Sequence, residues 1–170
     1  MAKLIVTADI HGSLSSWLTI KSLLNSQDQL AIAGDLFDTR YGNSSNSDFQ
    51  PEIIKKDLKR FKYNFYYTYG NCDVPSFFPG FDTNIQFHAF NFQIFLFHGN
   101  QAYPYSSNIN FLIQGHTHIY SLIQKNGQIF MNPGSITYPK NGIATYGVID
   151  NTCASIVELG TKKKLVSIKF

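Results

Sequence analysis

The sequence predicts one mixed α/β domain, in which one β-sheet packs on another, over residues 1–170. In the first 70 residues, short apolar runs typical of strands alternate with helical patterns, and later in the chain the strand-like runs form hairpins. With 170 residues, of which 44% are hydrophobic and 15% charged, the chain is long and apolar enough to bury a sizeable core.

The first half of the chain contains predicted strands, helices and one long loop. Short apolar runs predict three buried strands, at Lys3–Ala8, Leu30–Ala33 and Phe65–Tyr69. Apolar residues at helical spacing predict a helix over Ser13–Leu24, where the serine suits the helix start. A second helix is predicted over Pro51–Lys62 because proline is favoured in the first helical turn. Tyr41–Gln50 is rich in Asn and Ser and is predicted to be a loop.

The second half of the chain is richer in strand signals. Two aromatic runs within Ile85–Phe97 predict a hairpin that turns at Asn91, and Leu122–Met131 contains Asn126-Gly127, a strong hairpin turn signal. The remaining predicted strands are Phe111–Gln114, Thr145–Ile149, Ala154–Leu159 and Leu165–Phe170.

Charge and cysteine content exclude several classes of protein. The net charge is +3, and the basic residues near 55–62 and 162–164 form neither a long nor an arginine-rich patch, so stable nucleic-acid binding is not expected. Cys72 and Cys153 do not suggest a disulfide framework. No apolar run is long enough to cross a bilayer, and the N-terminus does not resemble a signal peptide. We therefore expect a cytoplasmic protein without membrane association.

Five polar motifs directly follow predicted strands, where loops converge to form ligand sites in α/β domains. The motifs are Asp9-Ile10-His11, Gly34-Asp35, Gly70-Asn71-Cys72-Asp73, His98-Gly99 and Gly115-His116-Thr117-His118. Alone, each Asp or Asn is typical of a turn or cap, and each His of a surface position. Four of the five histidines lie in these motifs, however, and only His88 lies in mid-strand, where a structural role is expected. The combined pattern predicts a metal site.

The spacing within the motifs suggests how ligands would converge. In extended backbone Asp9 and His11 would point to the same side and face one ion. His116 and His118 could do the same, or serve two neighbouring ions if the backbone turns between them. Asp35 has two oxygens and can bridge two metals. The glycines leave room where the backbone must crowd against ions; they are Gly34, Gly70, Gly99 and Gly115.

The ligand types limit the metal. Carboxylate, carboxamide and imidazole groups without an obligatory thiolate suit Mn, Fe, Co, Ni or Zn equally, and disfavour an all-oxygen calcium site. Among these metals, two ions of manganese are our first expectation.

In this order and spacing the motifs resemble the calcineurin-like metallophosphoesterase superfamily, and more narrowly its YfcE-type bacterial phosphodiesterases. The resemblance runs from Asp9 nearly to the C-terminus, including Asn132-Pro133-Gly134-Ser135, Pro139-Lys140 and Tyr146-Gly147, and is weakest over Asp38–Gln50. It implies a four-layer αββα sandwich of two mixed sheets with flanking helices. It also implies a first metal held by Asp9, His11, Asp35 and His118. The second metal would be held by Asp35, Asn71, His98 and His116.

The resemblance further implies a dinuclear phosphoesterase, acting on small diesters rather than monoesters, in which two metals generate a hydroxide nucleophile. Many relatives carry a proton-donating histidine where this chain has Cys72, which is expected to be a packing residue or at best a weak donor. Asp73 is expected to cap or orient its loop. Arg40 is either a phosphate contact or an exposed loop residue, and Asn132–Ser135 is expected to shape a turn near the metals, with Ser135 as support.

Two other functional classes fit the sequence less well. The superfamily contains non-catalytic Vps29-like scaffolds, which replace the bridging Asp and the motif Asn, whereas Asp35 and Asn71 are both present here. A nuclease would need a broad basic surface or a capping domain, which this chain lacks. The natural substrate and a homo-oligomeric state are left open by the sequence.

Overall fold

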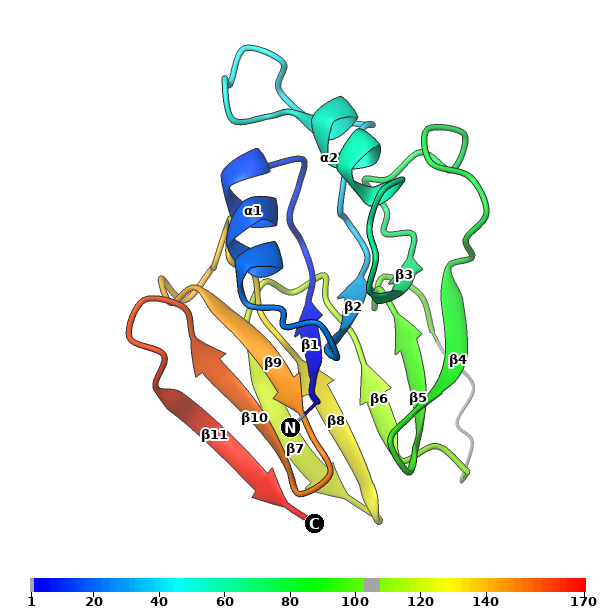
Figure 1. Cartoon of the computed structure of the whole chain (residues 1–170), viewed down its shortest axis with the longest axis vertical. Helices are drawn as coiled ribbons and strands as arrows, with labels where there is room; N and C mark the ends of the chain where they lie inside the picture. Colours follow the sequence, from blue (N-terminus) through cyan, green and yellow to red (C-terminus); the bar gives the residue numbers. More distant parts are fainter. Residues whose placement is uncertain (1, 103–107) are drawn as a thin grey trace.

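The computed structural model describes residues 2–102 and 108–170, which form two β-sheets and two helices (Figure 1). The first sheet has six strands, in the order β11 (Lys164–Lys169), β10 (Cys153–Glu158), β9 (Thr145–Ile149), β1 (Leu4–Thr7), β2 (Gln29–Ala33) and β3 (Asn64–Thr68). The second has five, in the order β4 (Asn84–Ala89), β5 (Phe92–Phe97), β6 (Phe111–Ile113), β8 (Gln128–Asn132) and β7 (Ser121–Lys125). The helices are α1 (Leu14–Ser22) and α2 (Pro51–Leu58).

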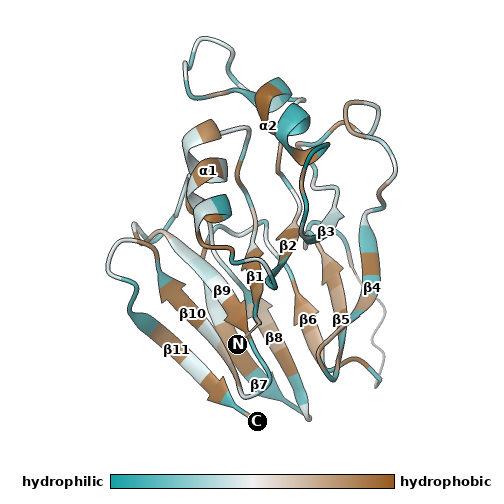
Figure 2. Cartoon of the chain, in the orientation of Figure 1, coloured by the Kyte–Doolittle hydropathy of each residue, from teal (hydrophilic) through white to brown (hydrophobic). Residues whose placement is uncertain are grey.

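The alternation of side chains along β1 shows how the layers are built. Leu4 and Val6 are fully buried in the core between the sheets, together with Ile94 of β5 and Ile113 of β6. Ile5 points to the opposite face, as expected for a strand with a period of two. In Figure 2 the strands β1, β5 and β6 are largely hydrophobic, in agreement with burial on both faces.

The helices cover the outer face of the first sheet. Trp17 of α1 and Ile54 of α2 are fully buried in a cluster that includes Ile5 of β1 and Ile32 of β2. Ser13 caps α1 by accepting a hydrogen bond from the backbone N–H of Ser16. Within residues 2–102 and 108–170 no helix lies on the outer face of the second sheet, so the described residues form three of the four expected layers.

All predicted strands and both helices are present, and both hairpins turn where the sequence predicts. The main difference is at α2, which ends at Leu58 rather than Lys62. There the backbone hydrogen bonds tighten to i→i−3, from Arg60 to Asp57 and from Phe61 to Leu58, and the chain turns into β3. Neither described helix has the length and hydropathy needed to span a membrane.

The directions of the central strands place five loops at one end of the molecule. Strands β1, β2 and β3 run parallel to one another, as do β5, β6 and β8. In Figure 1 the arrowheads of β1, β2, β3, β5 and β6 all point towards the same end. Loops from both sheets therefore meet at one edge of the sandwich.

Candidate metal centre

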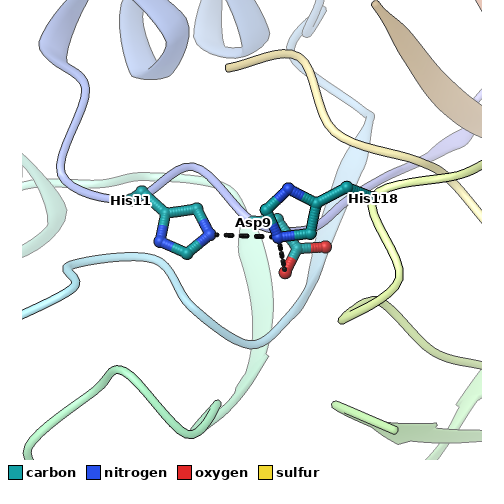
Figure 3. A group of neighbouring side chains, drawn as sticks. All are labelled: Asp9, His11 and His118. Atoms are coloured by element: carbon teal, nitrogen blue, oxygen red, sulfur yellow. Dashed lines mark hydrogen bonds and ion pairs between the residues drawn. The ribbon is translucent and has the colours of Figure 1, made fainter. Parts of the chain in front are cut away.

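All seven predicted ligand residues lie in the loops that follow β1, β2, β3, β5 and β6. The first group contains Asp9, His11 and His118 (Figure 3), whose candidate ligand atoms all lie within 4.8 Å of one another. His118 Nε2 is 3.5 Å from Asp9 Oδ1 and 3.3 Å from His11 Nε2. Because His118 follows β6 and the other two follow β1, this group joins the two sheets.

A second group surrounds His98. Its Nε2 lies 3.2 Å from Asp35 Oδ2, 3.1 Å from Asn71 Oδ1 and 3.2 Å from His116 Nδ1. Asp9 also belongs here, since its carboxylate lies within 4.8 Å of ligand atoms of Asp35 and His98. His116 and His118 thus face different groups, which is the alternative that a turn between them predicts. In this geometry Asp9 is common to both groups, and the bridging role of Asp35 stays a prediction.

Three histidines share one arrangement of hydrogen bonds. Nδ1 of His98 donates to the carbonyl of Ala33 at 2.8 Å, and Nδ1 of His118 donates to the carbonyl of Tyr138 at 2.9 Å. Nδ1 of His11 lies 3.0 Å from Asp38 Oδ2. When these outer nitrogens carry the proton, the Nε2 atoms are left with lone pairs aimed into the site, as in metal-binding histidines.

The distance between His11 and His118 provides a test of whether a cation fits. With both Nδ1 atoms protonated and both rings neutral, two Nε2 lone pairs face each other across 3.3 Å. That arrangement is repulsive unless a proton or a metal ion lies between the nitrogens. The Asp9 carboxylate completes a donor set of two imidazoles and one carboxylate, which suits a divalent transition metal. The residues therefore fit the ion that their motifs predict.

The two carboxyls are buried but differ in electrostatic environment. Burial raises the pKa of Asp9 from 3.8 to about 7, despite the opposing charge of His98. Burial acts in the same direction on Asp35, but the hydrogen bond and charge of His98 and the hydrogen bonds from Cys72 lower its pKa to about 2. Asp35 is thus ionised, and Asp9 is a carboxyl whose charge needs compensation by a cation.

We expect manganese to stabilise the folded protein more at about pH 8 than at about pH 6. Because the folded-state pKa of Asp9 is raised, its ionisation destabilises the metal-free protein as pH rises from about 4 to 7. A bound cation removes that cost, whereas at lower pH it must displace protons from Asp9 and the histidines. The measurement is the Mn²⁺-induced rise in melting temperature at both pH values. An equal or larger rise at pH 6 would contradict the assignment of Asp9 as a ligand.

The backbone of the site differs from the extended conformation that the sequence suggested. Among the described residues nine non-glycine residues have positive φ, and six belong to these loops, with φ between 50° and 69°. They are Asp9, His11, Asp35, Asp38, His116 and His118. The argument from extended backbone was therefore wrong for Asp9 and His11, which converge through left-handed turns. Such strain concentrates at functional sites because the surrounding structure must maintain it.

Three of the four glycines have the predicted crowding. A Cβ at Gly34 would collide with the His98 ring, and one at Gly70 would collide with the Asp35 carboxylate. At Gly115 a Cβ would lie 2.9 Å from Asp9 Oδ2. The crowding predicted at Gly99 is absent, because a Cβ there would make an ordinary contact at 3.4 Å. The φ of +104° at this residue still favours glycine.

Asp73 orients the loops that carry Asp35 and Asn71. Its buried carboxylate accepts hydrogen bonds from the backbone N–H groups of residues 36, 37, 38 and 70, at 2.9–3.3 Å. This confirms the loop-orienting role predicted for Asp73.

We expect Asp73→Ala to destabilise the protein by about 3 kcal/mol, because several buried N–H groups lose a charged acceptor. Asp73→Asn keeps one oxygen acceptor and should lose roughly half as much. Urea unfolding of both variants provides the measurement. A loss below about 0.5 kcal/mol in the alanine variant would mean that water replaces the carboxylate.

Asn132 and Ser135 support the site as predicted. Asn132 Nδ2 donates to the carbonyl of Gly115 at 2.8 Å and to Thr117 Oγ1 at 3.0 Å, which shapes the loop between the two histidines. Ser135 Oγ is fully buried and donates to the carbonyl of Asp9 at 2.8 Å. His88 is exposed in mid-strand of β4, away from both groups.

Sequence reasoning missed Asp38, which forms an ion pair with His11 when that ring is protonated. Burial alone would lower the pKa of His11, but the hydrogen bond to Asp38 and nearby carboxylates raise it. The only signal in the sequence was that Asp38 is an acidic residue three positions after Asp35.

Arg40 lies beside the site, where its backbone N–H donates to the carbonyl of Cys72 at 3.0 Å. Cys72 is half-buried, and its Sγ accepts a hydrogen bond from Asn71 Nδ2 at 3.2 Å.

A cavity of about 320 Å³ lies elsewhere, at the opposite end of the first sheet. It is lined by Lys21, Ser26, Asp57, Arg60, Phe61, Lys62 and Tyr63. Tyr63 directly precedes β3, whereas Asn71 follows that strand, so the cavity and the candidate metal centre are separated by the length of the strand.

The whole chain is similar in sequence and in fold to known proteins. The chain is 28% identical to the phosphodiesterase YfcE of Escherichia coli K12, over 99% of this chain and 98% of that protein. The solved structure of YfcE, described as a phosphoesterase from E. coli, matches with a TM-score of 0.83 and 26% identity over 98% of each chain. Vacuolar protein sorting 29 of Cryptosporidium parvum has the same fold, with a TM-score of 0.70 and 19% identity over 99% of this chain and 97% of that one.

The sequence profile of the calcineurin-like phosphoesterase superfamily domain matches residues 2–153. This range contains all seven predicted ligands and the loops that position them. The chain belongs to the calcineurin-like phosphoesterase superfamily.

Proposed function

We propose that this protein is a phosphodiesterase that hydrolyses small phosphodiesters with two divalent metal ions, manganese being the preferred metal. The observation that carries the proposal is the set of inward-facing Nε2 atoms of His11, His98 and His118, held beside two buried carboxylates. The similarity to the phosphodiesterase YfcE supports the choice of diesters.

The residues divide into two sets of proposed ligands. Asp9, His11 and His118 would hold one metal and Asn71, His98 and His116 the other, with Asp35 shared between them. When bound, two such ions lower the pKa of water enough to supply a hydroxide nucleophile and stabilise charge that develops on phosphate oxygens.

The chain's own side chains provide the frame for this chemistry. Asp38 and the carbonyls of Ala33 and Tyr138 each fix the orientation of one imidazole ring through its Nδ1 atom. The Nε2 atoms of these rings therefore need little rearrangement when ions bind. The hydrogen bond from Cys72 N–H holds one oxygen of Asp35 at 2.8 Å. A scaffold without catalysis would not require a complete donor set, so the intact set favours an enzyme over the Vps29-like alternative.

The test compares hydrolysis of bis(4-nitrophenyl) phosphate and 4-nitrophenyl phosphate by the purified protein supplied with Mn²⁺. We expect the diester to be preferred, activity to disappear on chelation and return with Mn²⁺, and elemental analysis to find close to two metals per chain. Absence of bound metal after supplementation with Mn, Zn or Ni would overturn the two-metal proposal. Metal binding without hydrolysis of either ester would favour the scaffold.

A further inference from the structure

A short segment beside the first ligand group is fixed relative to the metal centre. Ser135 Oγ donates to the carbonyl of Asp9 and accepts the backbone N–H of Tyr138 at 3.0 Å. Thr137 Oγ1 donates to the carbonyl of Ile10 at 3.0 Å. Hydrogen bonds therefore attach residues 135–138 to the backbone of Asp9 and Ile10, and these bonds set the position of the Tyr138 backbone.

The side chain of Tyr138 is exposed although it lies next to the site. Its ring centroid is 5.5 Å from that of His11, with the planes tilted by 57°, and 51% of the residue is accessible. Its backbone carbonyl already orients His118, so the orientation of that ligand does not depend on the phenol ring. An exposed aromatic ring whose backbone is anchored at the rim of a polar site is suited to stack on a planar group.

Lys140 brings positive charge to the same rim. Its backbone N–H donates to the carbonyl of His118 at 3.2 Å, and its side chain is exposed. That hydrogen bond fixes the Lys140 backbone beside the loop that carries the proposed ligand His118. An exposed cation in this position would attract phosphate oxygens.

We propose that Tyr138 and Lys140 form a recognition edge, in which the Tyr138 ring stacks on a planar aromatic group attached to phosphorus and Lys140 attracts the anionic oxygens. This inference rests on the proposed phosphodiesterase function and narrows its substrates to esters with an aromatic or heteroaromatic group close to the phosphate. The two residues have separable roles, because one selects the organic group and the other the charge.

The test uses phenylphosphonate and cyclohexylphosphonate, which share an anion but differ in planarity. Calorimetric titration of the Mn²⁺-supplied protein should show that wild type binds the phenyl compound about five-fold more tightly. Tyr138→Ala and Tyr138→Leu should remove this preference, and Tyr138→Phe should keep it. Lys140→Ala should weaken binding of both phosphonates by a similar factor and leave the preference unchanged.

Three results would overturn the recognition edge. The first is a phenyl preference that survives Tyr138→Ala, and the second is the absence of a phenyl preference in wild type. The third is a loss of bound Mn²⁺ in Tyr138→Ala, which would make the ring a support for His11 rather than a contact for the substrate. Hydrolysis of bis(4-nitrophenyl) phosphate by wild type is measured in parallel. If hydrolysis is present and the preference is absent, only the recognition edge fails, whereas absence of hydrolysis contradicts the proposed function itself.

Discussion

Replacing Asp35 with asparagine should lower the turnover number on the order of 10³-fold while leaving the fold largely intact. Asp35 is buried, its pKa of about 2 keeps it ionised, and its Oδ2 lies 3.2 Å from His98 Nε2. A neutral amide has nearly the same shape but cannot supply the negative charge that two adjacent cations require. The backbone hydrogen bond from Cys72 to Oδ1 is retained when the amide oxygen takes that position.

Asp28 provides a matched control for Asp35→Asn. Its side chain is equally buried, accepts hydrogen bonds from the backbone N–H groups of Lys3 and Asn25, and lies directly before β2 rather than after it. Asp28→Asn should therefore cost stability but preserve turnover. The measurement is kcat with bis(4-nitrophenyl) phosphate, together with metal content and melting temperature. Wild-type turnover with two bound metals in the Asp35 variant would show that Asp35 is not the bridge.

The sequence predicted the fold well where burial determines the pattern. The residues Leu4–Val6 of β1 are apolar and pack into the clusters on both faces of the sheet, and so short an apolar run followed by a turn is typical of a buried strand. The end of α2 was missed because Lys59–Lys62 are compatible with a helix, and the tightened turn after Leu58 depends on how the chain enters β3. Tertiary context, rather than propensity, decides such an end.

The chemical identity of the candidate site was predictable, but its geometry was not. Asp9 and His11 were identified by residue type and position after a strand, yet the left-handed φ of both residues has no sequence signal comparable to a glycine. Asp38 escaped notice because its partner, His11, lies 27 positions earlier in the chain. The backbone carbonyls of Ala33 and Tyr138 orient two histidines. Every residue type has such a carbonyl, so the sequence does not indicate which one will make the contact.

The second large effect concerns the leaving group. We expect the rate of diester hydrolysis to fall steeply as leaving-group pKa rises, so that aryl diesters are cleaved far faster than alkyl diesters. The family resemblance implies that Cys72 replaces a proton-donating histidine. Burial together with the charge of Asp35 raises the pKa of the Cys72 thiol. A thiol that holds its proton so tightly is a poor general acid, so an alkoxide would depart largely unassisted. Monoesters, which carry an additional negative charge, should also react slowly.

Cys72→His tests this explanation directly. The Cys72 thiol lies within 4.8 Å of a carboxylate oxygen of Asp38, so an imidazole placed there would have a neighbour that favours its protonated form. A positioned general acid contributes about 10²–10⁴-fold, and that gain should be greatest for diesters with the poorest leaving groups. The comparison is a series of diesters spanning leaving-group pKa, measured with both proteins at equal metal content. A flat dependence in the wild type, with chemistry shown to be rate-limiting, would mean that a residue other than Cys72 already donates the proton.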